Sequence, residues 1–267
     1  MSPIIVDSHA HLDSPVFAED FDQVLQRARE RNVSRILSIG CLRQDAESVR
    51  RLLEILASVP GVFAAFGVHP HDSSEWSDPV AERLLELASH PRAVAVGEIG
   101  LDFHYDNSPR EMQRAAFIRQ IELARELSVP IVIHTRESEN ETAEVLRRFF
   151  EKGDERSGVL HCFSGDPALA ETALERGFYF GIGGILTFKN ANALRKTVKT
   201  LPEDRILVET DCPYLAPVPY RGKRNEPAYA ARVVEALAEV RGATAQQVAQ
   251  HTASNFFTLF EKADPGS

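Results

Sequence analysis

Six side chains of the types that bind divalent metals follow short apolar runs in this sequence. They are His9, His11, Glu98, His134, His161 and Asp211. Imidazole and carboxylate groups form the open metal sites in which a bound ion activates water for hydrolysis. These residues are far apart in sequence, so such chemistry requires a fold that brings several strand ends together.

The two N-terminal histidines have the spacing of ligands to one ion. His9 and His11 are two positions apart, and on an extended strand both imidazoles point to the same face. A His-x-His pair alone is weak support, because it also arises by chance. Glu98 ends the apolar run Val94-Ala-Val-Gly, where an unpaired carboxylate would be costly to bury. Its two oxygens would allow it to bridge two ions.

The other three candidates repeat this arrangement. His134 ends Ile131-Val-Ile and His161 ends Gly158-Val-Leu, so two successive strands each finish on a histidine. Either histidine alone would more often be a hydrogen-bonded structural residue, but the pair favours ligands. Asp211 closes Leu207-Val-Glu-Thr and is a candidate ligand, base, or both.

The charges of this set favour two ions. Four neutral imidazoles and two carboxylates carry about −2, so two divalent cations leave about +2 and attract an anion. Two ions roughly 3.5 to 4 Å apart would activate a water and stabilise the attacking and leaving oxygens of a phosphodiester. We expect two divalent ions, of Zn, Mn, Mg, Fe or Ni, with Glu98 and Asp211 as catalytic residues and Asp211 as the proton carrier.

Short apolar runs alternate with amphipathic segments along the whole chain of 267 residues. The predicted strands are Ile4 to Ser8, Ser34 to Gly40, Val62 to Val68, Ala93 to Glu98, Ile131 to His134, Ser157 to His161, Phe178 to Ile182 and Arg205 to Glu209. The predicted helices are Ala18 to Arg31, Arg43 to Ser58, Val80 to His90, Pro109 to Ser128, Asn140 to Lys152, Pro167 to Arg176, Ala191 to Leu201, Pro227 to Arg241 and Ala245 to Phe260.

This alternation predicts an α/β fold with a parallel sheet, either closed or doubly wound. The metal candidates follow the first, fourth, fifth, sixth and eighth strands, and only a closed sheet lets the first strand meet the eighth. We therefore predict a TIM-like (β/α)8 barrel with an extra C-terminal helix, as one domain spanning residues 1–267.

Composition limits the functional class. A hydrophobic content of 43% and a charged content of 26% are those of globular proteins. The N-terminus shows neither a signal peptide nor a membrane span, and Cys41, Cys162 and Cys212 form no CxxC pair. We expect a cytoplasmic protein with reduced thiols, no membrane partner and no obligate protein partner. The thiols of Cys162 and Cys212 are expected to face the helical layer.

The net charge of −9 argues against a broadly basic nucleic-acid surface, but two loops are locally basic. One runs from Lys189 to Lys199, and the other holds Arg221, Lys223 and Arg224. Solvated surface patches explain them equally well. The further candidates for substrate contact or support of the metal ligands are His69, His71, His104, Glu209, Lys189, Arg221 and Arg224.

Several motifs, in this order, resemble the TatD family of metal-dependent deoxyribonucleases in the amidohydrolase superfamily. They are VDSHAHLD (6–13), FGVHPH (66–71), VGEIGLDF (96–103), IVIHTRE (131–137), LHCFSGD (160–166) and VETDCPYLAPVPYRGKRNEP (208–227). The resemblance implies a TIM-like barrel, a divalent-metal site and hydrolysis of DNA. It also implies that His9, His11 and Asp211 hold one metal, His134 and His161 the other, with Glu98 shared.

Other functions stay open at this point. Many small-molecule amidohydrolases carry a carbamylated lysine after the fourth strand, but here no lysine precedes Lys152. The same site would also suit an aminoacyl-tRNA ester or a small phosphate ester. A non-catalytic metal-stabilised binding protein is a more distant alternative, because structural zinc sites are normally rich in thiolates.

Overall fold

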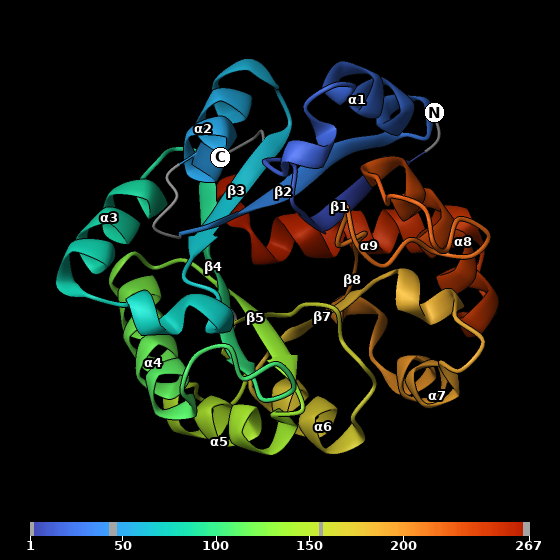
Figure 1. Ribbon diagram of the computed structural model, residues 1–267. Coiled ribbons are helices and arrows are strands. Elements are labelled where there is room, and N and C mark those ends of the chain that lie inside the picture. Colours follow the sequence, from blue (N-terminus) through green and yellow to red (C-terminus); the bar gives the residue numbers. More distant parts are fainter. Residues whose placement is uncertain (1–2, 43–46, 155–156, 264–267) are drawn as a thin grey trace.

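The computed structural model describes residues 3–42, 47–154 and 157–263, and these form a barrel of parallel strands surrounded by helices (Figure 1). The strands are β1 (Ile5–Ala10), β2 (Val33–Cys41), β3 (Val62–Gly67), β4 (Ala93–Asp102), β5 (Ile131–Arg136), β6 (Gly158–Leu160), β7 (Tyr179–Ile182) and β8 (Ile206–Val208). They lie in the order β1 to β8, each hydrogen-bonded to the next. The predicted (β/α)8 fold is confirmed.

The helices follow the predicted alternation. They are α1 (Phe21–Glu30), α2 (Glu47–Ser58), α3 (Asp78–Ala88), α4 (Arg110–Glu126), α5 (Glu139–Phe149), α6 (Pro167–Glu175), α7 (Asn192–Thr200), α8 (Ala230–Arg241) and α9 (Ala245–Leu259). Short 3-10 turns are η1 (Pro15–Phe17), η2 (Pro70–Glu75), η3 (Gly184–Thr187), η4 (Glu203–Arg205), η5 (Pro227–Tyr229) and η6 (Glu261–Ala263). Residues 43–46 of the second predicted helix lie outside the described residues. None of the helices in the described ranges has both the length and the apolar character needed to cross a bilayer.

The barrel closes between its first and last strands at the carboxyl end of β1. Ala10 and Cys212 form a parallel bridge, and the His11 N–H donates to the Cys212 carbonyl at 2.8 Å. The Asp211 N–H donates to the His9 carbonyl at 2.9 Å. Three predicted metal ligands therefore meet at the seam of the barrel, held together by backbone hydrogen bonds.

Two strands carry an extra residue beside the predicted ligands. In β4, Gly97 pairs with Val132 and Ile99 pairs with Ile133, so Glu98 has no partner residue on β5. In β1, the segment from Asp7 to Ala10 faces only the segment from Ile36 to Ser38 of β2. Such bulges redirect a side chain while pairing continues on both sides.

The strand ends differ from the predicted ones at four of the strands that carry metal candidates. Strand β4 continues past Glu98 to Asp102, and β5 continues past His134 to Arg136, because the bulge allows pairing to resume. Conversely, β6 ends at Leu160 and β8 at Val208, so His161 and Asp211 lie in the loops that follow.

Two hydrophobic cores hold the barrel. The larger one lies between the sheet and the helices, and it includes Cys212, as predicted for that thiol. The smaller one joins strand residues such as Val6, Leu37 and Leu207 to residues of α9 and η6. Because side chains alternate along strands, this second set faces the inside of the barrel.

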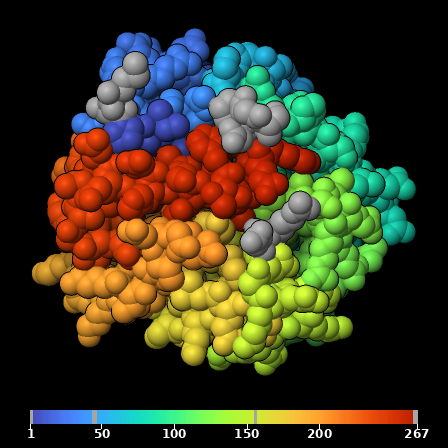
Figure 2. Space-filling view, turned by 180° about the vertical axis from the view of Figure 1, so that it is seen from behind, coloured from blue at the N-terminus to red at the C-terminus, as the bar shows by residue number. Residues whose placement is uncertain are grey.

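The predicted C-terminal helix covers the amino-terminal end of the barrel. Thr244 and Gln247 form a capping box at the start of α9. The Asn255 side-chain amide donates to the carbonyls of Glu203 and Ile206, where β8 begins. Viewed from behind, the C-terminal segment crosses the middle of this face (Figure 2). The opposite end of the barrel, where the predicted ligands lie, is left uncovered by α9.

Replacing Phe256 by alanine should lower the free energy of unfolding by about 3–5 kcal/mol, because it empties a fully buried position where α9 meets the barrel. Urea denaturation measures this loss. Phe257→Ala, at the partly buried neighbouring position, should cost clearly less. Equal losses for the two variants would show that Phe256 does not anchor α9.

Candidate metal centre

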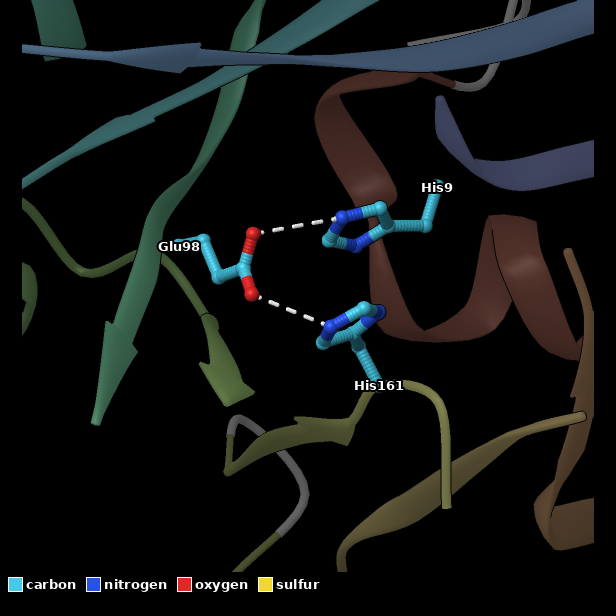
Figure 3. A group of neighbouring side chains, drawn as sticks. All are labelled: His9, Glu98 and His161. Carbon is cyan, nitrogen blue, oxygen red and sulfur yellow. Dashed lines mark ion pairs between the residues drawn. The ribbon is translucent and has the colours of Figure 1, made fainter. Parts of the chain in front are cut away.

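Glu98 lies at the centre of a group of histidines. Its Oε1 atom is 2.9 Å from His134 Nδ1, 3.0 Å from His161 Nε2 and 3.5 Å from His69 Nε2. Its Oε2 atom is 3.4 Å from His9 Nε2 and 4.0 Å from His11 Nε2. Figure 3 shows the carboxylate directed between His9 and His161. The two oxygens thus face two different sets of imidazoles.

Asp211 completes the side nearest the barrel seam. Its Oδ1 atom is 3.5 Å from His11 Nε2 and 3.8 Å from His9 Nε2. Its backbone has φ 58°, in the left-handed region that aspartate tolerates better than most residues. The hydrogen bond from its N–H to His9 fixes this turn. All six residues predicted as metal ligands are therefore brought together.

Three overlapping groups among the residues that the structure describes could each hold an ion. Within a group, the potential ligand atoms lie within 4.8 Å of one another. The groups are His9, Glu98 and His161; His9, His11 and Asp211; and His69, Glu98 and His134. These groups differ from the predicted ligand sets in two ways: they include His69, and they place His161 with His9. The rings of His9 and His161 are stacked, with their centroids 3.7 Å apart.

The donor atoms fit a metal site. Both ring nitrogens of His9 are buried and lack a hydrogen-bond partner among the described residues. Burial, with a contribution from His161, lowers the pKa of His9, which favours the neutral form that binds metals. Burial opposes ionisation of Glu98, yet His161 and His69 hold the pKa of that carboxyl well below its usual range. An ionised carboxylate and neutral imidazoles are the ligand forms that a divalent ion needs. Burial opposes protonation of His11, His134 and His161, but the surrounding carboxylates outweigh it and raise their pKa values, so these imidazoles would release protons as an ion binds.

Asp102, at the end of β4, supports the histidines from behind. Its Oδ2 atom lies 3.0 Å from His134 Nε2 and 3.0 Å from His71 Nε2. Its Oδ1 atom accepts the N–H groups of His104 and Tyr105 at 3.0 and 2.9 Å. A carboxylate on Nε2 leaves the Nδ1 atom of His134 to face Glu98, an arrangement typical of metal-binding histidines.

Glu209 lies beside His161, on the side of the ring away from Glu98. Its Oε1 atom accepts the Cys162 N–H at 2.6 Å and lies 3.3 Å from His161 Nδ1. The carboxylate fills the space beside Gly181, where a Cβ atom would come within 2.1 Å of Glu209 Oε2. A side chain at position 181 would therefore displace the Glu209 carboxylate, and the prediction that Glu209 supports a metal ligand has a geometric basis.

Asp7 fixes the loop that carries Asp211. Its Oδ1 and Oδ2 atoms accept the Thr210 N–H at 2.8 Å and the Thr210 hydroxyl at 2.6 Å. Burial raises the pKa of Asp7 to about 8, although the bonds from Thr210 oppose this rise. Sequence reasoning gave Asp7 no role. Its position two residues before His9 was the available signal.

The remaining predicted histidines lie in the same region. His69 Nδ1 accepts the His71 N–H at 3.2 Å, and burial lowers the pKa of His69 to about 4. His71 is bound to Asp102, as described above. His104 lies farther out, with its Nδ1 atom 2.6 Å from Oε1 of the exposed Glu137. Their roles remain predictions.

The predicted cations differ in their surroundings. Lys189 is exposed, and the Arg221 guanidinium lies over the Phe188 ring at 3.8 Å. Arg224 is engaged elsewhere: it donates to the Val16 carbonyl and to both oxygens of Asp20. Arg224 therefore connects the last loop to the loop before α1.

The prediction for the Cys162 thiol was wrong. Cys162 follows β6 in the left-handed region, with φ 46°, so the alternation expected of a strand does not apply. Burial and the charges of Asp211, Glu209 and Glu98 raise the pKa of its thiol well above the usual value. The thiol thus lies beside the metal candidates.

A parallel barrel with histidines and carboxylates at the carboxyl ends of its strands is an architecture that metal-dependent hydrolases use. Comparison with known proteins agrees. The family model described as TatD related DNase matches residues 6–261. The chain belongs to this family, and it is an enzyme of the metal-dependent hydrolase class.

Individual relatives match along nearly their whole length. The uncharacterized metal-dependent hydrolase YabD of Bacillus subtilis (strain 168) is 38% identical, over 96% of this chain and 99% of that protein. The 3'-5' ssDNA/RNA exonuclease TatD of Klebsiella pneumoniae (strain 342) is 36% identical, over 95% and 97%. The crystal structure of YjjV, a TatD homolog from Escherichia coli K12, superposes with a TM-score of 0.88 at 34% identity, over 96% and 98%.

The Asp20–Arg224 contact predicts a pH dependence. Arg224 and Arg27 lower the pKa of Asp20 to about 2, so the stabilisation is complete above the ordinary value and is lost as pH falls toward 2. Asp20→Asn should cost about 1 kcal/mol in free energy of unfolding at pH 6 and almost nothing near pH 2. Urea titrations at several pH values measure this.

Glu19→Gln is the matched control, because the exposed Glu19 makes no ion pair within the described part of the chain. Its effect should not vary with pH. The role assigned to this contact would be contradicted if Asp20→Asn lowered the free energy of unfolding by the same amount at pH 6 and at pH 2.

Proposed function

We propose that this enzyme is a divalent-metal-dependent nuclease that hydrolyses phosphodiester bonds, most directly as a deoxyribonuclease. The observation that carries the proposal is the position of Glu98, whose two oxygens face separate sets of histidines at the open end of the barrel. A carboxylate so placed suits two ions, the arrangement that serves phosphodiester hydrolysis. Relatives named as 3'-5' ssDNA/RNA exonucleases support this substrate class.

The proposed ligands divide into two sets. His9, His11 and Asp211 would hold one ion, His134 and His161 the other, and Glu98 would contact both. When bound, two divalent ions would lower the pKa of a water molecule and stabilise negative charge on phosphoryl oxygens. The imidazoles accept zinc, manganese, iron or nickel, and the carboxylates also tolerate magnesium.

Asp211 is the residue we assign to proton transfer. Its carboxylate lies at the mouth beside His11, and its backbone is fixed by the bond to His9. Among the six candidates it is the only carboxylate outside the shared position, so it can accept a proton without separating the two ligand sets.

His69 is assigned as a hydrogen-bond donor to a phosphoryl oxygen. Its Nδ1 atom accepts the His71 N–H, so the proton of the neutral ring is on Nε2. That Nε2 atom faces the centre, 3.5 Å from Glu98 Oε1. A protonated Nε2 cannot ligate an ion but can donate to charge that builds up during phosphoryl transfer.

Parallel assays with metal-loaded enzyme test the proposal directly. Single-stranded DNA, aminoacyl-tRNA and a chromogenic phosphodiester are compared, and elemental analysis gives the metal content. We expect cleavage of DNA to be the fastest reaction. Faster release of the amino acid from aminoacyl-tRNA, or hydrolysis of the chromogenic compound alone, would contradict the nuclease proposal. It would indicate that the same site hydrolyses another kind of ester.

Glu98→Gln and Asp211→Asn should separate binding from turnover. Loss of the shared carboxylate should remove roughly one ion or more per chain, because Glu98 contacts both ligand sets. Asp211→Asn should keep more metal while lowering kcat at least about 100-fold, as expected for loss of a proton carrier. Elemental analysis and steady-state kinetics give the two quantities. Full activity of Asp211→Asn would show that Asp211 takes no part in proton transfer.

His69→Phe should keep the metal content and lower kcat about 100-fold, because it removes one donor near the developing charge. His69→Gln, which retains an N–H donor, should recover part of the rate. A drop in metal content in either variant would show that His69 is a ligand instead, as its group with Glu98 and His134 allows.

A further inference from the structure

Arg136 stands at the mouth of the barrel next to the proposed metal site. It is the last residue of β5, two positions beyond His134, so both side chains leave the same face of the strand. His134 is half-buried and Arg136 is exposed. The strand thus carries a ligand candidate inside the mouth and a cation directly above it.

The guanidinium of Arg136 is held by an aromatic ring. Its Cζ atom lies 4.5 Å from the centroid of the Tyr105 ring. Tyr105 is itself fixed, because its N–H donates to Asp102 and its ring packs edge-on against His71 at 5.4 Å. Stacking on a ring leaves the N–H edges of a guanidinium available for another partner.

No carboxylate neutralises this cation in the part of the chain that the structure describes. Nearby arginines are paired, Arg110 with Asp106 and Arg114 with Glu141. Glu137, the next residue after Arg136, instead contacts His104. Arg136 therefore differs from its neighbours on this rim, since its charge is available to a ligand.

We propose that Arg136 binds a phosphate group of the nucleic-acid substrate and that Tyr105 is the residue that positions it. The inference rests on the proposed nuclease function, and it names a contact outside the set of metal ligands. A planar guanidinium matches two oxygens of a phosphate, which a flexible ammonium group does less well. Stacking on Tyr105 reduces the side-chain freedom that binding would otherwise remove.

The test uses the metal-loaded enzyme with a single-stranded oligonucleotide and with inorganic phosphate. Arg136→Ala should raise KM for the oligonucleotide about 10-fold or more, with kcat changed much less. It should also reduce the salt dependence of oligonucleotide binding by about one phosphate contact, a change of about 0.7 in the slope of log K against log salt. The metal content should not change.

Conservative variants separate charge, shape and positioning. Arg136→Lys should restore the salt dependence of oligonucleotide binding but only part of the affinity, because lysine keeps the positive charge and lacks the planar set of N–H donors of a guanidinium. Tyr105→Leu should raise KM in the same direction as Arg136→Ala, and Tyr105→Phe should retain more affinity than Tyr105→Leu. Arg29→Ala is the control, since Arg29 is an exposed arginine in the last turn of α1, at the other end of the barrel.

The outcomes distinguish this inference from the proposed function. If the unaltered enzyme cleaves the oligonucleotide and Arg136→Ala binds it with unchanged KM and salt slope, the Arg136 assignment is overturned and the nuclease stands. If the unaltered enzyme neither cleaves nor binds the oligonucleotide, the nuclease proposal fails. Weaker binding of inorganic phosphate by Arg136→Ala would then still identify Arg136 as an anion-binding residue, and unchanged binding would overturn that as well.

Discussion

The buried carboxylate of Glu98 is the constraint on which the rest of the site depends. Only 3% of the residue is exposed, and a charge at such a position is costly unless other groups compensate for it. The compensation comes from imidazole nitrogens on both sides, the nearest being those of His134 and His161. The bulge in β4 is what directs this one side chain inward while the strand keeps its pairing. A cation between these groups would meet the same electrostatic demand more fully.

A second layer of carboxylates holds these imidazoles in place. Asp102 contacts the far nitrogen of His134, and Glu209 lies beside the far nitrogen of His161. Asp7 binds Thr210 and so fixes the loop of Asp211. His134, His161 and the loop of Asp211 therefore each have an outer carboxylate beside them, and these outer carboxylates accept backbone N–H groups. Preorganisation of this kind is what a metal site requires from its protein.

The mouth of the barrel adds features that suit an extended anionic substrate. Tyr105 and Tyr214 are among the exposed large side chains, and they lie against His71 and His11 respectively. Arg136 stands over Tyr105 without a carboxylate partner in the described ranges. The molecule as a whole is acidic, so the binding of a phosphate backbone that we propose would depend on this local arrangement rather than on net charge.

The sequence by itself determined the order of the elements, the parallel barrel and the six inner candidates, because apolar periodicity and the residue types after each run are local properties. Only the tertiary structure decided how the strand ends meet. Pairing continues beyond the bulge at Glu98, which carries β4 to Asp102 and β5 to Arg136, and both residues lie beside the site. Pairing register, left-handed turns at Cys162 and Asp211, and contacts between distant strands depend on the closed sheet. No local pattern encodes them, because their energies come from groups that meet only after the barrel closes.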